Sequence, residues 1–124
     1  MDVLLYLHIL GAAVWVGGLI VVGALVPAVR AQTDDLEVVR AIARRFGLVS
    51  WIALTVQVTT GSLMLFDRVW STTLSVKIGL VVVSAIFAAW HSLFARQQSP
   101  ALRGAIQGII LILALVIVWL GIQL

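Results

Sequence analysis

Three ionisable side chains lie inside stretches of sequence that are otherwise apolar. His8 lies in the run LLYLHILGAAVWVGGL, and Lys77 and His91 lie in a later apolar run. Because an ionisable group is costly to place in hydrocarbon, such residues usually serve a function. A neutral imidazole is a ligand for iron and copper, and a lysine in a dry site loses its proton or pairs with an anion. These residue types point first to the binding of a metal or a cofactor.

Each of these residues also has a structural interpretation. His8 can form a hydrogen bond between helices, and Lys77 can extend its amine to the lipid headgroups. Both interpretations stay open for these two residues. His91 follows Trp90 in the sequence and is expected to lie at a membrane interface.

The segments that carry these residues are long enough to cross a membrane. The chain has 124 residues, of which 63% are hydrophobic and 10% charged, against roughly 45–50% and about 25% in soluble domains. Four apolar stretches reach the roughly 20 residues that a membrane-spanning helix needs. They are residues 3–29, 47–66, 74–94 and 104–123. We expect a single domain, residues 1–124, with an all-α fold: a four-helix bundle integral to the membrane.

The basic residues predict the orientation of the four spans. Six of the eight lie between the first and second or between the third and fourth spans: Arg30, Arg40, Arg44, Arg45, Arg96 and Arg103. Arg68 and Lys77 lie on the other side. Because cytoplasmic loops carry the excess of basic residues, both termini are expected outside the cytoplasm, in a bacterial-type inner membrane. The net charge of +3 therefore indicates contact with the lipid bilayer and not with nucleic acid.

Turn and capping residues indicate where helices begin. Asp34 is followed three positions later by Glu37, an arrangement like a capping box, so the second helix is expected to start well before its membrane span. Ser99-Pro100 is expected to open the fourth helix.

Several classes of function are excluded by what the chain lacks. It has no cysteine, which excludes disulfides, iron–sulfur clusters and thiol chemistry. All five acidic residues lie at span ends or in loops, so a proton relay through the membrane is not expected. No nucleophile triad, paired carboxylates, phosphate loop or HExxH motif occurs in the sequence.

Polar side chains are expected to gather in the outer leaflet. His8 lies near the outer end of the first span, and Lys77 near that of the third. Gln57, Thr60 and Met64 recur at helical spacing on one face of the second span, toward its outer end. These five residues form the predicted site.

His91 is expected at the opposite end of the third span, too far from this site to join it. It follows Lys77 by four helical turns, or roughly 21 Å at 1.5 Å per residue. Since metal–nitrogen bonds are about 2 Å long, His8 and His91 of one chain are not expected to bind the same metal.

Small residues flank the tryptophan of the first span. Gly11, Trp15 and Gly18 form a stripe on one helical face. Small residues let another helix approach closely. The stripe leaves room for such a helix or for a flat ligand.

Three stretches carry a resemblance to a known family. LHILGAAVWVGGL resembles the first span of the copper-resistance D (CopD) family, RRFGLVSWIALTVQVTTG its next span, and LSVKIGLVVV the one that follows. The order of histidine and lysine is also similar to that of the HemJ-type protoporphyrinogen oxidases, which hold haem b. The matched positions are His8, Trp15, Gly17, Gly18, Phe46, Thr60, Gly61 and Lys77.

The resemblance implies redox chemistry in the membrane on a bound haem b or porphyrin. His8 is then the expected axial ligand, and Lys77 pairs with a propionate or serves as the second ligand. The other expected contacts are Trp15, Gly18, Gln57 and Thr60.

Two alternatives from other classes remain open. The first is copper handling, for which the chain offers His8, Met64 and Met1, although Cu(I) prefers more sulfur ligands. The second is an accessory subunit without chemistry of its own. Such a subunit would join a homodimer or a larger membrane complex through the small-residue faces of the first and fourth spans.

Overall fold

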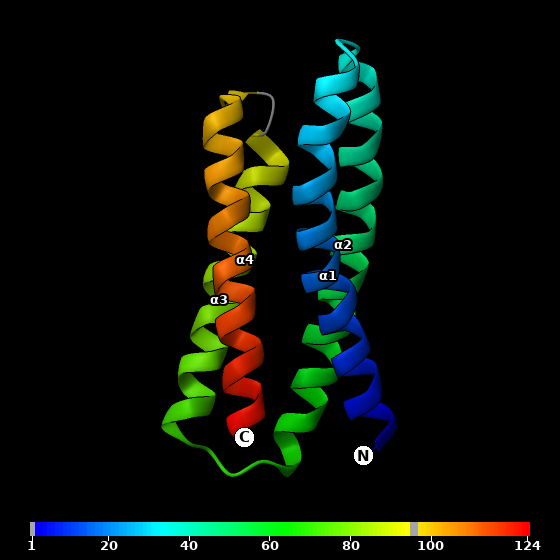
Figure 1. The fold of residues 1–124 in the computed structure, drawn as a ribbon. Helices are drawn as coiled ribbons and strands as arrows, with labels where there is room; N and C mark the ends of the chain where they lie inside the picture. The colour runs from blue at the N-terminus through cyan, green and yellow to red at the C-terminus, as the bar shows by residue number, and fades with distance from the viewer. Residues whose placement is uncertain (1, 95–96) are drawn as a thin grey trace. The chain divides into compact units, whose positions relative to one another are not determined.

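The protein consists of four long helices, and the computed structural model describes residues 2–94 and 97–124 (Figure 1). The helices are α1 (Asp2–Gln32), α2 (Leu36–Met64), α3 (Thr72–Phe94) and α4 (Pro100–Gln123), with a short 3₁₀ helix η1 (Leu65–Asp67) after α2. No strand occurs in the two described ranges. The prediction of an all-α fold is confirmed.

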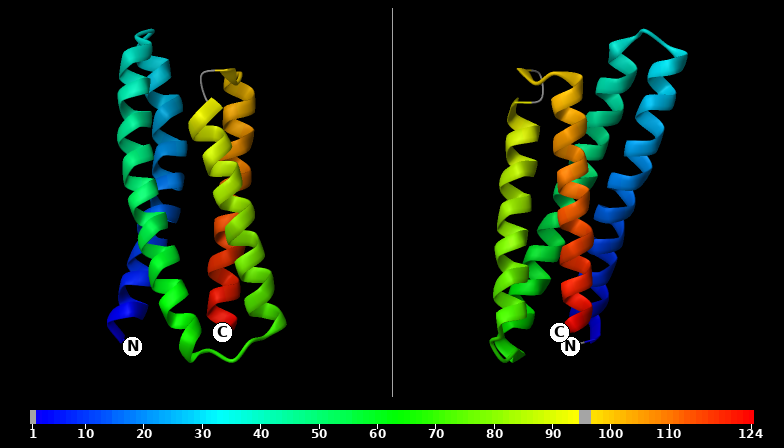
Figure 2. Two further views of the ribbon diagram at one scale, coloured as in Figure 1. Left: turned by 180° about the vertical axis from the view of Figure 1, so that it is seen from behind. Right: turned by 60° about the vertical axis from the view of Figure 1, so that its left-hand side comes forward.

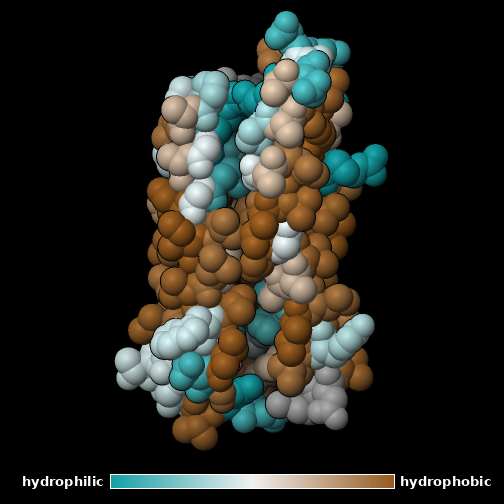
Figure 3. Space-filling model, in the orientation of Figure 1, coloured by the Kyte–Doolittle hydropathy of each residue, from teal (hydrophilic) through white to brown (hydrophobic). Residues whose placement is uncertain are grey.

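Each of the four helices is long and apolar enough to span a membrane. The shortest, α3, has 23 residues, which corresponds to about 35 Å at 1.5 Å per residue, against a hydrocarbon core of about 30 Å. On the face shown in Figure 3, hydrophobic residues cover the middle of the helices and hydrophilic residues gather toward their ends. The protein is therefore a small integral membrane protein, as predicted.

The chain forms two compact units, one ending at Arg68 and the other beginning at Val69. Each unit is an antiparallel pair of helices: α1 with α2 in the first hairpin, and α3 with α4 in the second (Figure 2). The first hairpin holds His8, and the second holds Lys77 and His91.

The connection between α1 and α2 differs in detail from the prediction. The N-cap of α2 is Asp35 and not Asp34, because Asp35 Oδ1 accepts a hydrogen bond of 3.0 Å from the Glu37 backbone N–H. Thr33 Oγ1 in turn accepts one from the Asp35 N–H at 3.1 Å, which sets the turn one residue later. α2 begins at Leu36, eleven residues before the apolar stretch expected at 47–66. Its first turns carry an exposed Glu37–Arg40 ion pair of 2.7 Å.

The second hairpin begins both of its helices at serines. Ser99 caps α4 by accepting a hydrogen bond of 3.1 Å from the Leu102 N–H, and Pro100 occupies the first turn, where its missing N–H costs nothing. The prediction for Ser99-Pro100 is confirmed. Ser71 likewise accepts a hydrogen bond of 3.2 Å from the Leu74 N–H at the start of α3.

Candidate functional site

The ring of His8 is held by α2 through its Nδ1 atom. Nδ1 lies 3.0 Å from the backbone oxygen of Gln57 and 3.0 Å from Thr60 Oγ1. Gln57 and Thr60 are one turn apart on α2, and Thr60 is only 5% exposed. The first hairpin thus brings together three of the predicted site residues, and their helical spacing was the signal that grouped them.

These contacts determine which nitrogen of His8 carries the proton. A backbone carbonyl only accepts hydrogen bonds, so Nδ1 must donate to Gln57. The hydroxyl of Thr60 directs its single hydrogen to backbone oxygens of its own helix, with Val56 O at 2.7 Å, and therefore also accepts from Nδ1. In the neutral ring the lone pair consequently lies on Nε2.

Gly61 provides the surface against which the His8 ring packs. A Cβ atom on Gly61 would lie 3.1 Å from His8 Cε1 and 3.6 Å from Nδ1. A side chain at position 61 would require the ring to shift away from α2. Thr60 therefore forms a hydrogen bond with the His8 ring, and Gly61 leaves space for the ring to pack against α2.

Gln57, whose backbone oxygen meets His8, also carries a polar side chain in the contact between α1 and α2. Its side-chain Oε1 is buried and, within residues 2–94 and 97–124, has no hydrogen-bond partner. The same side chain passes over Gly11 of α1, where a Cβ would lie 2.8 Å from Gln57 Cγ and 3.2 Å from Ala53 O. The first hairpin therefore presents an unsatisfied acceptor at the level of His8.

Two glycines of α1, Gly11 and Gly18, serve the contact with α2. Gly11 meets Gln57 and Ala53, and a Cβ on Gly18 would lie 3.2 Å from the Phe46 ring. The sequence left open whether a helix or a flat ligand lies against this stripe of small residues. At Gly11 and Gly18 the structure shows the helix α2. Trp15, between them, is buried at 4% exposure.

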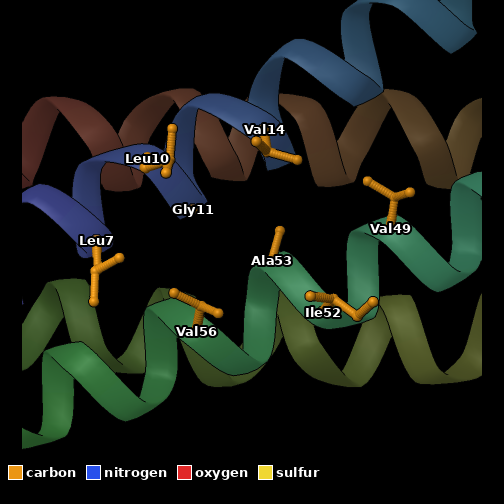
Figure 4. Close-up of a pocket in the computed structure, with 8 residues that line it drawn as sticks. All are labelled: Leu7, Leu10, Gly11, Val14, Val49, Ile52, Ala53 and Val56. Atoms are coloured by element: carbon orange, nitrogen blue, oxygen red, sulfur yellow. The ribbon is translucent and has the colours of Figure 1, made fainter.

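An apolar groove lies between α1 and α2 and was not predicted. It has a volume of about 280 Å³. Figure 4 shows its walls facing one another; they are Leu7, Leu10, Gly11 and Val14 from α1, and Val49, Ile52, Ala53 and Val56 from α2. Leu7 precedes His8 directly and Gly11 follows it by three residues, so one end of the groove lies at the same level of α1 as the histidine.

Two other residues of the predicted site, Met64 and Lys77, belong to the end of α2 and to α3. Met64 is buried at the end of α2, and Met1, the other predicted copper ligand, is outside the described residues. Lys77 belongs to the second hairpin, where its Nζ would lie 3.3 Å from a Cβ on Gly121 of α4. A joint site of His8 and Lys77 therefore stays a prediction.

The protein has few side chains that could bind a metal ion through nitrogen or carboxylate oxygen atoms. In the part of the chain that the structure describes, no three His, Cys, Asp or Glu side chains gather around one point. A haem needs only one or two axial ligands from the protein, so a single well-oriented histidine is chemically sufficient for it.

Comparisons of the chain with models of protein families, with curated proteins and with solved structures found no match. The likeness to the CopD and HemJ-type families is carried by the quoted motifs alone.

Proposed function

We propose that this protein binds a b-type haem or a related porphyrin in the membrane, with His8 as its axial ligand, and takes part in membrane redox chemistry. The observation that carries the proposal is the fixed tautomer of His8. His8 Nδ1 lies 3.0 Å from both Gln57 O and Thr60 Oγ1, so in the neutral ring the lone pair that is proposed to bind iron is on Nε2.

This arrangement has the features of a metal-binding histidine. Such a residue generally donates its other ring N–H to a backbone carbonyl or a carboxylate, which fixes the ring and raises its basicity. Here a carbonyl and a hydroxyl from one turn of α2 share that role. A histidine serving only to join two helices needs one of these acceptors, not both.

The surroundings of His8 suit a tetrapyrrole. The apolar groove of α1 and α2 offers a water-poor surface for the apolar edge of a macrocycle. Gln57 Oε1, buried and unsatisfied among the described residues, can accept a hydrogen bond from a protonated propionate of haem or, in an iron-free porphyrin, from a pyrrole N–H. Fit is thus supported by one ligand nitrogen, one acceptor and one apolar surface.

The protein's own groups would bind and tune the cofactor. When bound, haem supplies one-electron transfer. His8 supplies the axial nitrogen, α2 fixes the plane of its ring, and the groove keeps water away. Lys77 is proposed to neutralise a propionate or to act as the second ligand.

Titration of the purified, haem-free protein in detergent with haemin tests this proposal. We expect the Soret band to shift and to saturate at one haemin per chain, with a dissociation constant of about 1 µM or below, or about 8 kcal/mol of binding free energy. A linear increase like that of protein-free micelles would contradict the proposal. Saturable binding of copper without haemin binding would replace it by the copper site at His8 and Met64.

Thr60→Val is expected to weaken haemin binding without unfolding the hairpin. The change removes one acceptor of the Nδ1–H and keeps the shape of the side chain. Loss of such an outer partner typically lowers metal affinity about 10–100-fold. The matched control is Thr55→Val on the same helix, because the exposed Thr55 hydroxyl donates only to its own backbone at Trp51 O, 2.8 Å away. Equal affinities of the two variants would show that Thr60 does not support the ligand.

We further propose that both termini lie outside the cytoplasm, as the six-to-two distribution of basic residues predicts. Alkaline phosphatase fused to the C-terminus is expected to be active in a bacterial host, and a green fluorescent protein fused there to be dark when exported through the general secretory route. The reverse pattern would place the termini in the cytoplasm and the His8 site in the inner leaflet.

A further inference from the structure

A hydrogen-bonded cluster joins the end of α3 to the start of α4 in the second hairpin. His91 Nε2 lies 2.8 Å from Gln107 Nε2, and His91 Nδ1 lies 3.3 Å from Gln98 Oε1. Gln107 belongs to α4, and Gln98 lies in the connection just before the helix cap Ser99. The expectation that His91 is merely interfacial leaves this network unexplained.

The hydrogen bonds of this cluster all run in one direction. An amide nitrogen only donates, so Gln107 Nε2 donates to His91 Nε2. The proton of the neutral ring then lies on Nδ1, which donates to Gln98 Oε1. This series of hydrogen bonds ends at the side-chain amide nitrogen of Gln98, which has two N–H groups to donate.

Two donors at this end of the hairpin are buried and have no acceptor within residues 2–94 and 97–124. Gln98 is only 8% exposed, and its Nε2 has no hydrogen-bond partner among the described residues. The same holds for Nε of Arg103. Arg103 precedes Gln107 by four residues and so shares its face of α4, and its charge acts on His91. Buried donors without acceptors are costly, since each loses its hydration.

The second hairpin offers these donors no acidic side chain. From Val69 to Leu124 the sequence contains no aspartate or glutamate, so no acidic side chain of this hairpin can pair with Arg103. The donors also lie at the N-terminus of the 24-residue helix α4, where the helix dipole favours an anion. A group that satisfies this end of the hairpin must bring acceptor oxygens and negative charge.

We propose that Gln98, Arg103 and the N-terminus of α4 form a binding site for a phosphate group, supplied by an anionic phospholipid headgroup or by free phosphate. A phosphate oxygen accepts from the guanidinium N–H and the amide N–H groups that the protein leaves unsatisfied. His91 acts as a positioning residue, because its Nδ1–H orients the Gln98 amide. The site lies at the N-terminus of α4, which is one end of a candidate membrane-spanning helix, and lipid headgroups are found at that level.

Native mass spectrometry of the detergent-solubilised protein tests this site. The probes are dioctanoyl phosphatidylglycerol, dioctanoyl phosphatidylcholine and inorganic phosphate, each added separately. We expect one phosphatidylglycerol to remain bound at concentrations at which phosphatidylcholine, whose choline group cancels the charge, does not. Retention of inorganic phosphate at least as strong would identify free phosphate as the source, and its absence would identify the lipid.

Matched variants separate a specific site from general attraction to positive charge. Arg103→Gln and Gln98→Leu are each expected to lower binding about tenfold or more, because each removes a donor to a charged group. Arg45→Gln removes the same charge from an exposed arginine of the first hairpin and should bind as the wild type does. Equal loss in Arg45→Gln, or no loss in Arg103→Gln, would overturn the proposal.

A fourth variant keeps the test valid if the others unfold. Gln98→Glu places a carboxylate among the unsatisfied donors, so we expect it to raise the melting temperature of the ligand-free protein and to abolish phosphate binding. A lower melting temperature together with undiminished binding would contradict the site. Neither result depends on haem, because neither Gln98 nor Arg103 is among the proposed haem contacts.

Discussion

His8→Ala is expected to abolish saturable haemin binding and the Soret band that accompanies it. The substitution removes the nitrogen ligand, whereas Thr60→Val only removes support for it. The neighbouring side chains of Gln57 and Thr60 cannot replace an imidazole as an iron ligand. The measurement is the haemin titration of the variant, with helix content followed by circular dichroism.

The other histidine of the chain provides the matched control. His91→Gln changes the same residue type in the second hairpin, where His91 bonds to Gln98 and Gln107. We expect this variant to bind haemin as the wild type does. Unchanged binding in His8→Ala would eliminate His8 as the ligand, and loss of binding in both variants would point to general destabilisation.

Gly11→Ala is expected to destabilise the first hairpin by about 1–3 kcal/mol, the usual cost of overpacking a tight contact. The new Cβ would lie 2.8 Å from Gln57 Cγ and 3.2 Å from the backbone oxygen of Ala53. The Gln57 side chain would have to shift, and the Ala53 carbonyl, as part of the α2 backbone, cannot move independently of the helix. Unfolding by heat or by denaturing detergent measures the effect.

Gly17→Ala is the control for this change on the same helix. No atom lies within 4 Å of a Cβ on Gly17, so alanine should be tolerated and should raise stability by roughly 0.5–1 kcal/mol through its better helix propensity. If both variants changed stability in the same direction and to the same extent, α1 would not contact α2 through Gly11.

Helices and shared faces could be predicted from the sequence because both depend on local rules. Long apolar runs must be helical in lipid, where the backbone has no other hydrogen-bond partners. Helical spacing alone places Gln57 and Thr60 on one face, and the structure brings His8 to that face. Ser99-Pro100 was likewise predictable, since serine and proline act on the helix start itself.

Features that depend on the rotation of one helix against another could not be predicted. Gly11 and Gly17 look alike in the sequence, yet only Gly11 lies under the neighbouring helix. The groove between α1 and α2 could not be predicted for a related reason. In helices that are apolar on every side, the residues that line a groove do not stand out from those that face lipid.

The polar cluster of the second hairpin was missed because its members are far apart in sequence. His91 and Gln107 are separated by 16 positions, and Gln98 lies in a connection that has no periodic pattern. A lone histidine beside a tryptophan suggested an interface, and only the antiparallel packing of α3 and α4 shows its partners. The direction of the hydrogen bonds then reveals the unsatisfied amide.

The absorption spectrum of the protein as purified from its membrane tests the central claim most directly. It is recorded oxidised and after reduction with dithionite, with iron and copper measured on the same sample. A Soret band, sharpened α and β bands on reduction and one iron per chain are the result that the His8 site predicts. A protein that is colourless and iron-free, and that stays so after haemin is supplied during expression, would contradict it.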